Sequence, residues 1–241
     1  MSSIHPLDKV LVVVPTFNDS PLLRDISAEI IALSDTYRVL IVDDGSMEPV
    51  DVDSLPDGLM LFRLPANFGL GLCTHVAFDH ALKHGYTAVV RIDADGQHPV
   101  QEIPRLLEQL QSEADLVVGT RTNRNAGTGL RAWFATLVRG YLSWVAKVVT
   151  HGAAPRDVNS GFFAANATAM WLLNKYRLER YPEPQIYILS CRRGLRLKEL
   201  NIEQRERRFG SSTLTVTHAL RLFYRFNIFI AAEILQGSRT E

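Results

Sequence analysis

Two aspartates, Asp93 and Asp95, follow a short apolar run, Ala88-Val89-Val90, that is typical of a buried strand. Gln97 comes two residues later, where the chain must turn. Carboxylate and amide oxygens at this spacing suit Mg²⁺ or Mn²⁺, which keep coordination positions for water or a substrate phosphate. The alternative is a polar loop whose aspartates cap the helix that opens near Pro99.

Three more polar clusters each follow a predicted strand. The runs 10–14, 37–42 and 59–64 lead to Pro15-Thr16-Phe17-Asn18-Asp19, to Asp43-Asp44-Gly45-Ser46 and to Asn67-Phe68-Gly69-Leu70-Gly71. The aspartates could hydrogen-bond a base or a ribose, and the glycines could bring backbone amides close to a ligand. Each cluster alone also fits an ordinary turn. Four clusters at four successive strand ends favour a binding edge.

The elements between these clusters alternate between strand and helix. Apolar residues recur at helical spacing over 21–34, and a second helix is predicted over 72–84. This order predicts an α/β fold with a mostly parallel sheet flanked by helices, in a single domain over 1–241. Ligands of such sheets bind at the carboxyl ends of the strands, which is where the polar clusters fall.

Composition limits the function further. The 241 residues contain 26 Lys plus Arg and 26 Asp plus Glu, so no overall field attracts nucleic acid, and no nucleic-acid partner is predicted. Cys73 and Cys191 lie far apart, as expected for two reduced thiols in a cytoplasmic protein. We recognise no signal peptide at the N-terminus and no apolar stretch long enough to predict a transmembrane helix.

The clusters, in this order, resemble the motifs of family 2 glycosyltransferases of GT-A fold. Gly119-Thr120-Arg121, Asn159-Ser160-Gly161-Phe162-Phe163 and Arg207-Arg208-Phe209-Gly210-Ser211-Ser212 extend the resemblance to residues 8–215. The segment Asp93-Ala94-Asp95-Gly96-Gln97-His98-Pro99 is most similar to the branch of dolichol- and polyprenyl-phosphate sugar synthases. The resemblance implies a nucleotide-binding half over 8–121, an acceptor half over 122–215 and a C-terminal amphipathic helix over 216–241.

The resemblance also implies a role for each motif residue. Nucleotide-binding residues would be Pro15, Thr16, Asn18, Asp19, Asp43, Asp44, Gly45, Asn67, Gly71, Asp93, Ala94 and Arg121. The metal, Mg²⁺ or Mn²⁺, would be held by Asp93, Asp95 and Gln97. Acceptor-binding residues would be Ser160, Gly161 and Ser212, and catalytic residues would be Asp95, Glu183 and Arg207. The donor would be a UDP-, GDP- or dTDP-linked sugar, transferred in a metal-dependent, inverting reaction.

Two acceptors remain open. Family members that glycosylate a hydroxyl usually carry a Glu-Asp pair whose aspartate is the base, but here only Glu183 is acidic in that region. A phosphate acceptor is already ionised and needs no base, so the first choice is a polyprenyl phosphate. The alternative is a hydroxyl of a glycan, a lipid-linked saccharide or a small molecule, with Glu183 as base. Glu183 could also be no more than a favourable charge at a helix N-terminus.

Two predicted helices, over 132–149 and 220–235, carry stripes of aromatic and aliphatic residues. Such stripes are more often core than membrane contact. Arg221 and Arg225 also suit a helix lying at a membrane surface, which predicts a peripheral protein on its inner face, with a possible membrane partner protein. The polar stretch 122–131 is either a passive connector or a substrate-gating loop. A nucleotidyltransferase and a non-catalytic sugar-nucleotide sensor are the competing functions from other classes.

Overall fold

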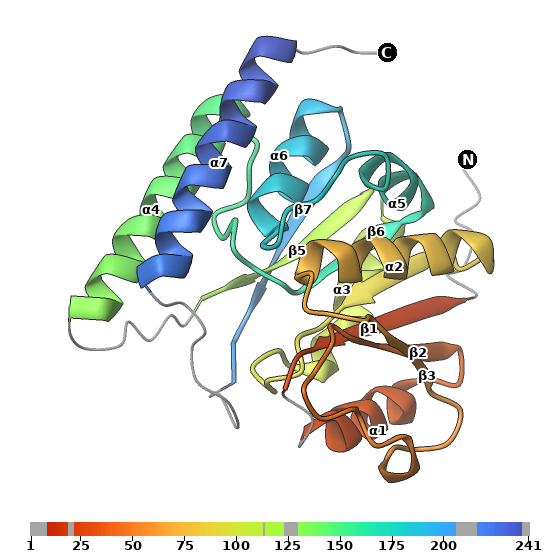
Figure 1. The fold of residues 1–241 in the computed structure, drawn as a ribbon. Coiled ribbons are helices and arrows are strands. Elements are labelled where there is room, and N and C mark those ends of the chain that lie inside the picture. The colour runs from red at the N-terminus through yellow and green to blue at the C-terminus, as the bar shows by residue number, and fades with distance from the viewer. Residues whose placement is uncertain (1–8, 19–21, 113, 123–129, 206–215, 238–241) are drawn as a thin grey trace.

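The computed structural model describes residues 9–18, 22–112, 114–122, 130–205 and 216–237 (Figure 1). Seven strands form one sheet in the order β3-β2-β1-β4-β6-β5-β7. The strands are β1 (Val10–Thr16), β2 (Tyr37–Asp43), β3 (Met60–Arg63), β4 (Ala88–Arg91), β5 (Leu116–Arg121), β6 (Phe163–Asn166) and β7 (Leu197–Ile202). The helices of more than one turn are α1 (Leu23–Leu33), α2 (Leu70–Lys83), α3 (Ile103–Gln111), α4 (Leu130–Val149), α5 (Ala167–Leu173), α6 (Glu183–Arg192) and α7 (Val216–Gln236).

The sheet is mostly parallel, as the sequence predicted. Strands β1, β2, β3 and β4 run parallel, and β7 runs parallel to β5. Only β6 is antiparallel, and it pairs with both β4 and β5. The sequence analysis did not predict β6, because its four residues, Phe-Ala-Ala-Asn, contain no β-branched side chain and no alternation.

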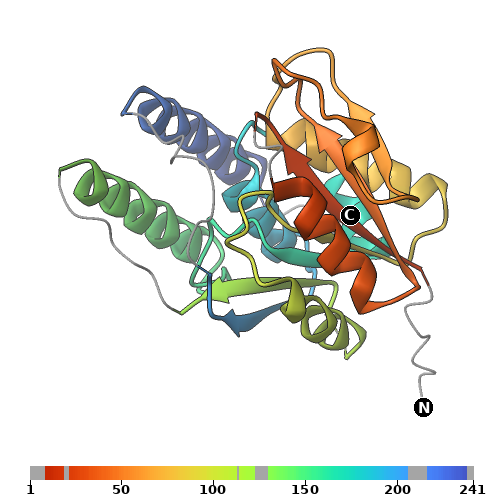
Figure 2. The same ribbon diagram turned by 90° about the horizontal axis from the view of Figure 1, so that it is seen from below.

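Helices cover both faces of the sheet (Figure 2). Alternate residues of β1 enter different cores because successive side chains of a strand point to opposite faces. Val12 and Val14 pack with α1 and α3, whereas Leu11 and Val13 pack on the face covered by α2, α5 and α6. The β1 side chains are almost completely buried, which explains their uninterrupted apolar sequence.

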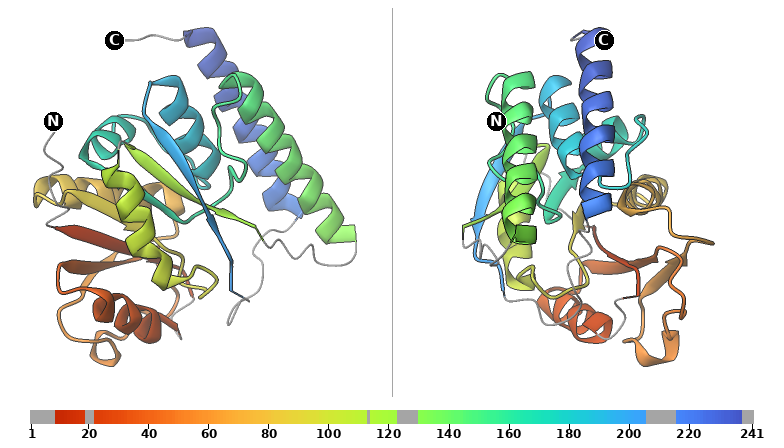
Figure 3. Two further views of the ribbon diagram at one scale, coloured as in Figure 1. Left: turned by 180° about the vertical axis from the view of Figure 1, so that it is seen from behind. Right: turned by 60° about the vertical axis from the view of Figure 1, so that its left-hand side comes forward.

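Helices α4 and α7 lie side by side along one flank of the molecule (Figure 3). The Tyr141 hydroxyl donates to Asn227 Oδ1 at 2.6 Å, and the ring of Tyr141 lies 4.9 Å from that of Phe223. Glu233 on α7 accepts from Arg192 and Arg193 at the end of α6. These contacts fix α7 against α4 and against the α/β body.

The apolar stripe of α4 is core only in part: Val145 is buried and Tyr141 packs against the core, whereas other members of the stripe face solvent. Trp133 and Trp144 are 60% and 63% exposed, and Tyr224 on α7 is 67% exposed. Only one side of each helix, including Leu142 and Phe226, packs inward. Sequence periodicity finds such a stripe but does not show which of two apolar sides meets the body. Among the described residues, every helix is too short or too polar to cross a bilayer.

Candidate active site

The carboxyl ends of β1 and β2 form the first part of the site. Thr16 and Asp43 are register partners, and the Asp44 amide donates to the Thr16 carbonyl at 2.9 Å. Asp43 is 0% exposed, and its Oδ1 accepts from the Ser46 amide at 2.9 Å. Its Oδ2 lies 3.5 Å from Arg63 Nε but makes no hydrogen bond among the described residues, and neither does Thr16 Oγ1. Two buried oxygens at this edge therefore lack a hydrogen bond to the described residues.

Asp44 has a different role from its neighbour. Its two carboxylate oxygens accept from the amides of Phe68 and Gly69, each at 2.8 Å. Burial raises the pKa of Asp44, and the two amides oppose that increase. The sequence left open whether the 67–71 amides meet a ligand or close a turn. In the structure, the amides of Phe68 and Gly69 donate to Asp44, which ties the loop after β3 to the end of β2.

The two glycines after β3 allow the chain to approach itself. Gly69 has φ +98°, and a Cβ there would come within 2.3 Å of the Arg180 side chain. A Cβ on Gly71 would lie 2.1 Å from the Glu179 carbonyl oxygen. These glycines therefore allow the backbone at 69–71 to lie close against the segment 178–180. Asn67, just before them, keeps a buried Oδ1 without a hydrogen-bond partner among the described residues.

The loop after β1 is joined to the loop after β2. Asn18 has φ +58°. Its backbone N–H donates to Ser46 Oγ, and its side-chain Oδ1 accepts from the backbone N–H of Met47, both at 2.9 Å. Gly45 has φ +72°, and a Cβ there would lie 2.5 Å from the Ala66 backbone. Pro15 is part of β1, paired in register with Val42. The predicted nucleotide-binding residues of these loops are therefore neighbours, except Asp19, which lies outside the described residues.

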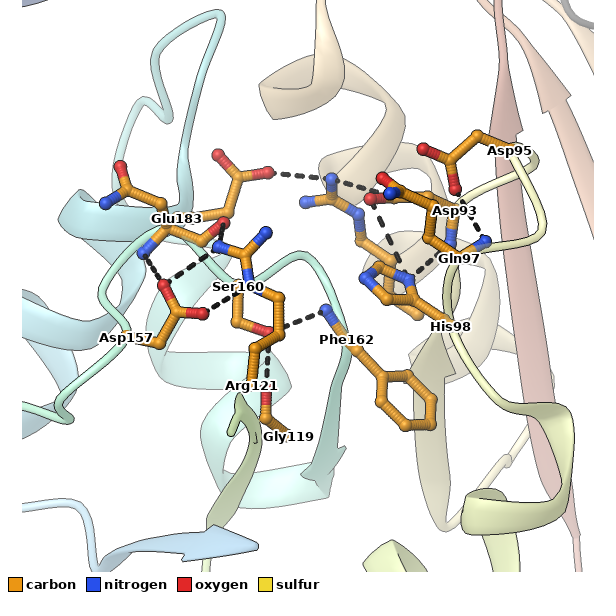
Figure 4. A network of polar contacts seen from close by, with 12 residues as sticks. Asp93, Asp95, Gln97, His98, Gly119, Arg121, Asp157, Ser160, Phe162 and Glu183 are labelled. Atoms are coloured by element: carbon orange, nitrogen blue, oxygen red, sulfur yellow. Dashed lines mark hydrogen bonds and ion pairs between the residues drawn. The ribbon is translucent and has the colours of Figure 1, made fainter. Parts of the chain in front are cut away.

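The Asp93–Gln97 turn directly follows β4 (Figure 4). The Asp93 amide donates to His98 Nδ1 at 3.1 Å, and the Gln97 amide donates to Asp95 Oδ1 at 3.0 Å. Gly96 has φ +74°, which lets the chain reverse. Burial lowers the pKa of His98, in agreement with an unprotonated Nδ1 that accepts a hydrogen bond. Ala94, the remaining residue of this motif, is buried.

Arg91, the last residue of β4, links the two halves of the site. It is 2% exposed, and its Nη2 donates to Glu183 Oε1 at 2.7 Å and to Asp93 Oδ1 at 3.2 Å. Its Nε and Nη1 are buried without a hydrogen-bond partner among the described residues. Burial lowers the pKa of Arg91, but Glu183 and Asp93 raise it by more. The sequence analysis missed Arg91, although an arginine inside the apolar run of a buried strand is itself a signal of a charge partner.

The two carboxylates beside Arg91 differ in exposure. Glu183 begins α6 and is buried, whereas the Asp93 side chain is 34% exposed. Burial raises the pKa of Asp93, but the charge of Arg91 opposes this and the pKa lies below its ordinary value, so Asp93 stays ionised. A Cβ on Gly161 would come within 2.7 Å of Asp93 Oδ2. The glycine therefore keeps space open beside this carboxylate.

The acceptor side of the site contains a second arginine–carboxylate pair. Arg121 Nη2 donates to Asp157 Oδ1 at 2.9 Å, and its Nε donates to Oδ2, so the pairing is bidentate. Asp157 is fully buried. Burial lowers the pKa of Arg121, but Asp157 raises it by more. Sequence reasoning placed Arg121 near phosphates, and in the structure its guanidinium already holds a carboxylate.

Ser160 has its hydroxyl directed into the protein. The Oγ donates to the Gly119 carbonyl at 2.6 Å, and the Ser160 carbonyl accepts from the Tyr187 hydroxyl. Ser160 is fully buried, and its side chain holds the segment before β6 against β5. Asn159, beside it, has a buried Nδ2 without a partner among the described residues.

The residues present fit a divalent cation. Among the described residues no three His, Cys, Asp or Glu side chains form a metal cluster. Mg²⁺ commonly binds one or two carboxylates and completes its shell with water and substrate phosphate, so Asp93 and Asp95 with Gln97 suffice. The open space that Gly161 leaves beside Asp93 agrees with this. One oxygen of each carboxylate is already engaged, because Asp93 Oδ1 accepts from Arg91 and Asp95 Oδ1 accepts from the Gln97 amide.

Two predicted catalytic and acceptor residues, Arg207 and Ser212, lie outside the described residues, as does 123–129 of the stretch 122–131. The chain that leads to Arg207 reaches the candidate metal turn. The Arg205 amide donates to the Gln97 carbonyl at 2.9 Å, and Arg205 Nη1 lies 3.3 Å from Glu29 Oε2 on α1.

Known proteins resemble this chain in sequence. A family model described as Glycosyl transferase family 2 matches residues 11–172, more than half of the chain. Polyprenol monophosphomannose synthase of Mycolicibacterium smegmatis is 32% identical over 50% of this chain and 48% of its own length. This chain thus aligns with about half of that relative. Undecaprenyl-phosphate mannosyltransferase of Micrococcus luteus is 28% identical to this chain, and the alignment covers 86% of this chain and 88% of that protein.

Solved structures share the fold. Glucosyl-3-phosphoglycerate synthase from Mycobacterium tuberculosis, crystallised with Mn²⁺, UDP and phosphoglyceric acid, has a TM-score of 0.71 and 16% identity over 92% of this chain and 78% of that one. A crystal form of the same enzyme with Mg²⁺ and UDP has a TM-score of 0.67 and 17% identity over 92% of this chain and 79% of that one. The motifs, the sheet and the matching family model confirm the predicted GT-A fold, and the chain belongs to glycosyl transferase family 2.

Proposed function

We propose that this family 2 glycosyltransferase moves a sugar from a nucleoside diphosphate to the phosphate of a polyprenyl phosphate. One observation carries the choice of acceptor: the carboxylates on the acceptor side are each paired with a buried or half-buried arginine. Glu183 accepts from Arg91, and Asp157 accepts from Arg121. A carboxylate that already accepts hydrogen bonds from an arginine is engaged in an ion pair. A phosphate nucleophile needs no base, whereas a hydroxyl usually does.

Two relatives support this choice. The Mycolicibacterium smegmatis protein is a polyprenol monophosphomannose synthase, and the Micrococcus luteus protein is an undecaprenyl-phosphate mannosyltransferase. A mannosyl donor is therefore the first to test, in its UDP-, GDP- and dTDP-linked forms.

The chain's own residues divide the work. Thr16 Oγ1 and Asp43 Oδ2, which are buried without a hydrogen bond to any described residue, are suited to accept hydrogen bonds from the nucleoside. Asp95, with Asp93 and Gln97, would hold Mg²⁺ or Mn²⁺. A divalent cation bound there would neutralise the charge that develops on the leaving diphosphate. Arg91 holds Asp93 and Glu183 in place, and Arg207 remains a proposed phosphate ligand.

Helices α4 and α7 support a place at a membrane surface. Their outward sides carry Trp133, Trp144 and Tyr224, and α7 also carries the exposed Arg221 and Arg225. Aromatic side chains can enter the headgroup region while arginines reach lipid phosphates. We propose peripheral binding at the inner face of the membrane. A membrane partner protein would complement this binding, because one or two amphipathic helices attach reversibly.

A matched pair of acceptors tests the proposed function. The enzyme is incubated with Mn²⁺ and each sugar nucleotide, and either undecaprenyl phosphate or undecaprenol, which differ only in the phosphate. We expect glycosylated lipid and free nucleoside diphosphate with undecaprenyl phosphate but not with undecaprenol. The Glu183→Gln variant should retain substantial activity with undecaprenyl phosphate. If only hydroxyl acceptors react and Glu183→Gln is inactive, the alternative with Glu183 as base is correct. Release of pyrophosphate would instead indicate a nucleotidyltransferase.

A further inference from the structure

A groove lies between α7, the segment 177–185 and residues 67–68. Its volume is about 460 Å³, within the range of small-molecule sites. Of the residues assigned above to the donor, metal or acceptor, only Asn67 lines it. We call it the arginine groove, because its charged lining consists of Arg177, Arg180, Arg221, Arg225 and a single carboxylate, Glu179.

The charges of the arginine groove are not balanced from within. Arg225 pairs with Glu179, and Arg180 Nη1 donates to the Asn67 carbonyl at 3.1 Å. The guanidinium groups of Arg177 and Arg221 make no hydrogen bond or ion pair with any described residue. Both side chains belong to exposed residues on opposite walls, one on the segment before α6 and the other on α7. Two available arginines facing one hollow favour an anionic ligand, above all a phosphate, which guanidinium binds in a bidentate manner.

The rest of the lining is apolar. Leu222, Phe226 and Phe229, one turn apart along α7, form one wall, and Leu178 and Pro184 contribute to the other. Phe226 is buried in the core, so this wall is a fixed part of the fold. A small inorganic anion would leave this surface unused. The combination of arginines and an apolar wall fits a ligand with a charged head and an apolar body.

We propose that the arginine groove binds a phosphate group carried on an apolar chain. This inference rests on the proposed function, because that function brings the protein to lipid phosphates. Two sources share the chemistry: the isoprenoid phosphate acceptor and the headgroup of a membrane phospholipid. Arg177 and Arg221 bind the phosphate, and the α7 wall contacts the first part of the chain.

The test compares a double variant with a charge-matched control. Arg177→Gln/Arg221→Gln removes the two available arginines, and Arg24→Gln/Arg105→Gln removes two exposed arginines on α1 and α3. Binding of farnesyl monophosphate is measured by calorimetry, with farnesol and inorganic phosphate as probes of the separate parts. Binding to phosphatidylcholine vesicles is measured with and without phosphatidylglycerol. Nucleoside diphosphate binding and melting temperature are measured on all proteins.

We expect the groove variant to bind lipid phosphate at least about tenfold more weakly, since each lost hydrogen bond to a charged group is worth this much. Loss confined to farnesyl monophosphate identifies the isoprenoid source, and loss confined to phosphatidylglycerol vesicles identifies the phospholipid. Equal binding by the groove variant and the control overturns the inference. Failure of the wild type to glycosylate undecaprenyl phosphate, with arginine-dependent binding intact, would refute the proposed function and leave the groove standing.

Discussion

Buried polar groups at the two ends of the sheet differ in how completely they are hydrogen-bonded. At the amino end of β5, Asp115 accepts from Asn166 Nδ2, from the Arg196 amide and twice from the Arg196 guanidinium, at 2.9–3.1 Å. Both of its oxygens are fully used. At the carboxyl end of β2, Asp43 is at least as buried, yet one of its oxygens has no hydrogen bond among the described residues.

The same contrast holds across the described part of the chain. Six side chains there bury a polar atom that lacks a hydrogen-bond partner, and five of them lie at the carboxyl ends of the parallel strands: Thr16, Asp43, Asn67, Arg91 and Asn159. The exception is Ser27, on α1. A buried polar group without a partner costs stability, so its concentration at one end needs a reason. A bound donor that supplies the missing partners is the simplest one.

The largest expected effect comes from Asp95. Asp95→Asn keeps an oxygen that can accept from the Gln97 amide, so the turn and the melting temperature should survive. The negative charge that attracts a divalent cation is lost, and turnover should fall by on the order of 10³-fold. Nucleoside diphosphate release measures this, with Asp79→Asn on the exposed face of α2 as the control. Wild-type turnover in the variant, or in the presence of a chelator, contradicts the metal site.

Arg91 gives the next largest effect, on stability. Arg91→Met leaves Glu183 buried without its cation, which should cost about 3 kcal/mol in the free energy of unfolding. The lower end of the usual range applies because the Asp93 side chain is 34% exposed and can recruit water. Urea denaturation measures the loss. Adding Glu183→Gln should restore much of the stability, and a double variant as unstable as Arg91→Met would refute the pairing argument.

These first two positions show what the sequence could and could not reveal. The apolar runs of β1, β2 and β4 locate their own ends, so the positions of Asp43, Asp93 and Asp95 follow from local pattern. Arg91 meets Glu183 across 92 positions of sequence, and that pairing depends on how β4 and α6 pack. Local pattern likewise could not predict β6, whose alanines carry no strand signal.

Adjacent residues of one motif can have different roles, and only the three-dimensional structure distinguishes them. Asp43 and Asp44 both follow β2, and the sequence assigned both to the nucleotide. In the structure both oxygens of Asp44 accept from backbone amides, whereas Asp43 Oδ2 has no hydrogen bond to a described residue. Ser160 is a similar case, because its motif suggests an acceptor contact but its hydroxyl is bonded to the Gly119 carbonyl.

A paired substitution sharpens this difference. Asp43→Asn retains one oxygen for the Ser46 amide and replaces the other with an NH₂ group, so nucleoside diphosphate affinity should fall by about 1–3 kcal/mol. Asp44→Asn loses one of its two amide contacts and should mainly lower the melting temperature. Calorimetry and thermal denaturation of both variants measure the two effects. Wild-type affinity in Asp43→Asn would contradict its place in the donor site.

The smallest effect is expected at the saturated amino end. Burial raises the pKa of Asp115, but the hydrogen bonds from Arg196 and Asn166 lower it by more, so the folded-state pKa lies below the ordinary value. An aspartate with a depressed folded-state pKa stabilises the protein above its unfolded pKa of about 3.9. That contribution is lost as the pH falls through the folded-state pKa.

Asp115→Asn should therefore cost about 1 kcal/mol at neutral pH, because Asn still accepts some of these bonds. The difference from wild type should be constant above about pH 5 and shrink below pH 4. Arg196→Gln should cost less, since the Arg196 side chain is 61% exposed and water replaces its charge. Urea denaturation across this pH range measures all three proteins, and donor affinity serves as the internal control. A pH-independent difference would show that Asp115 stabilises the fold by shape and not by charge, and a loss of donor affinity would show that the two ends of the sheet are coupled.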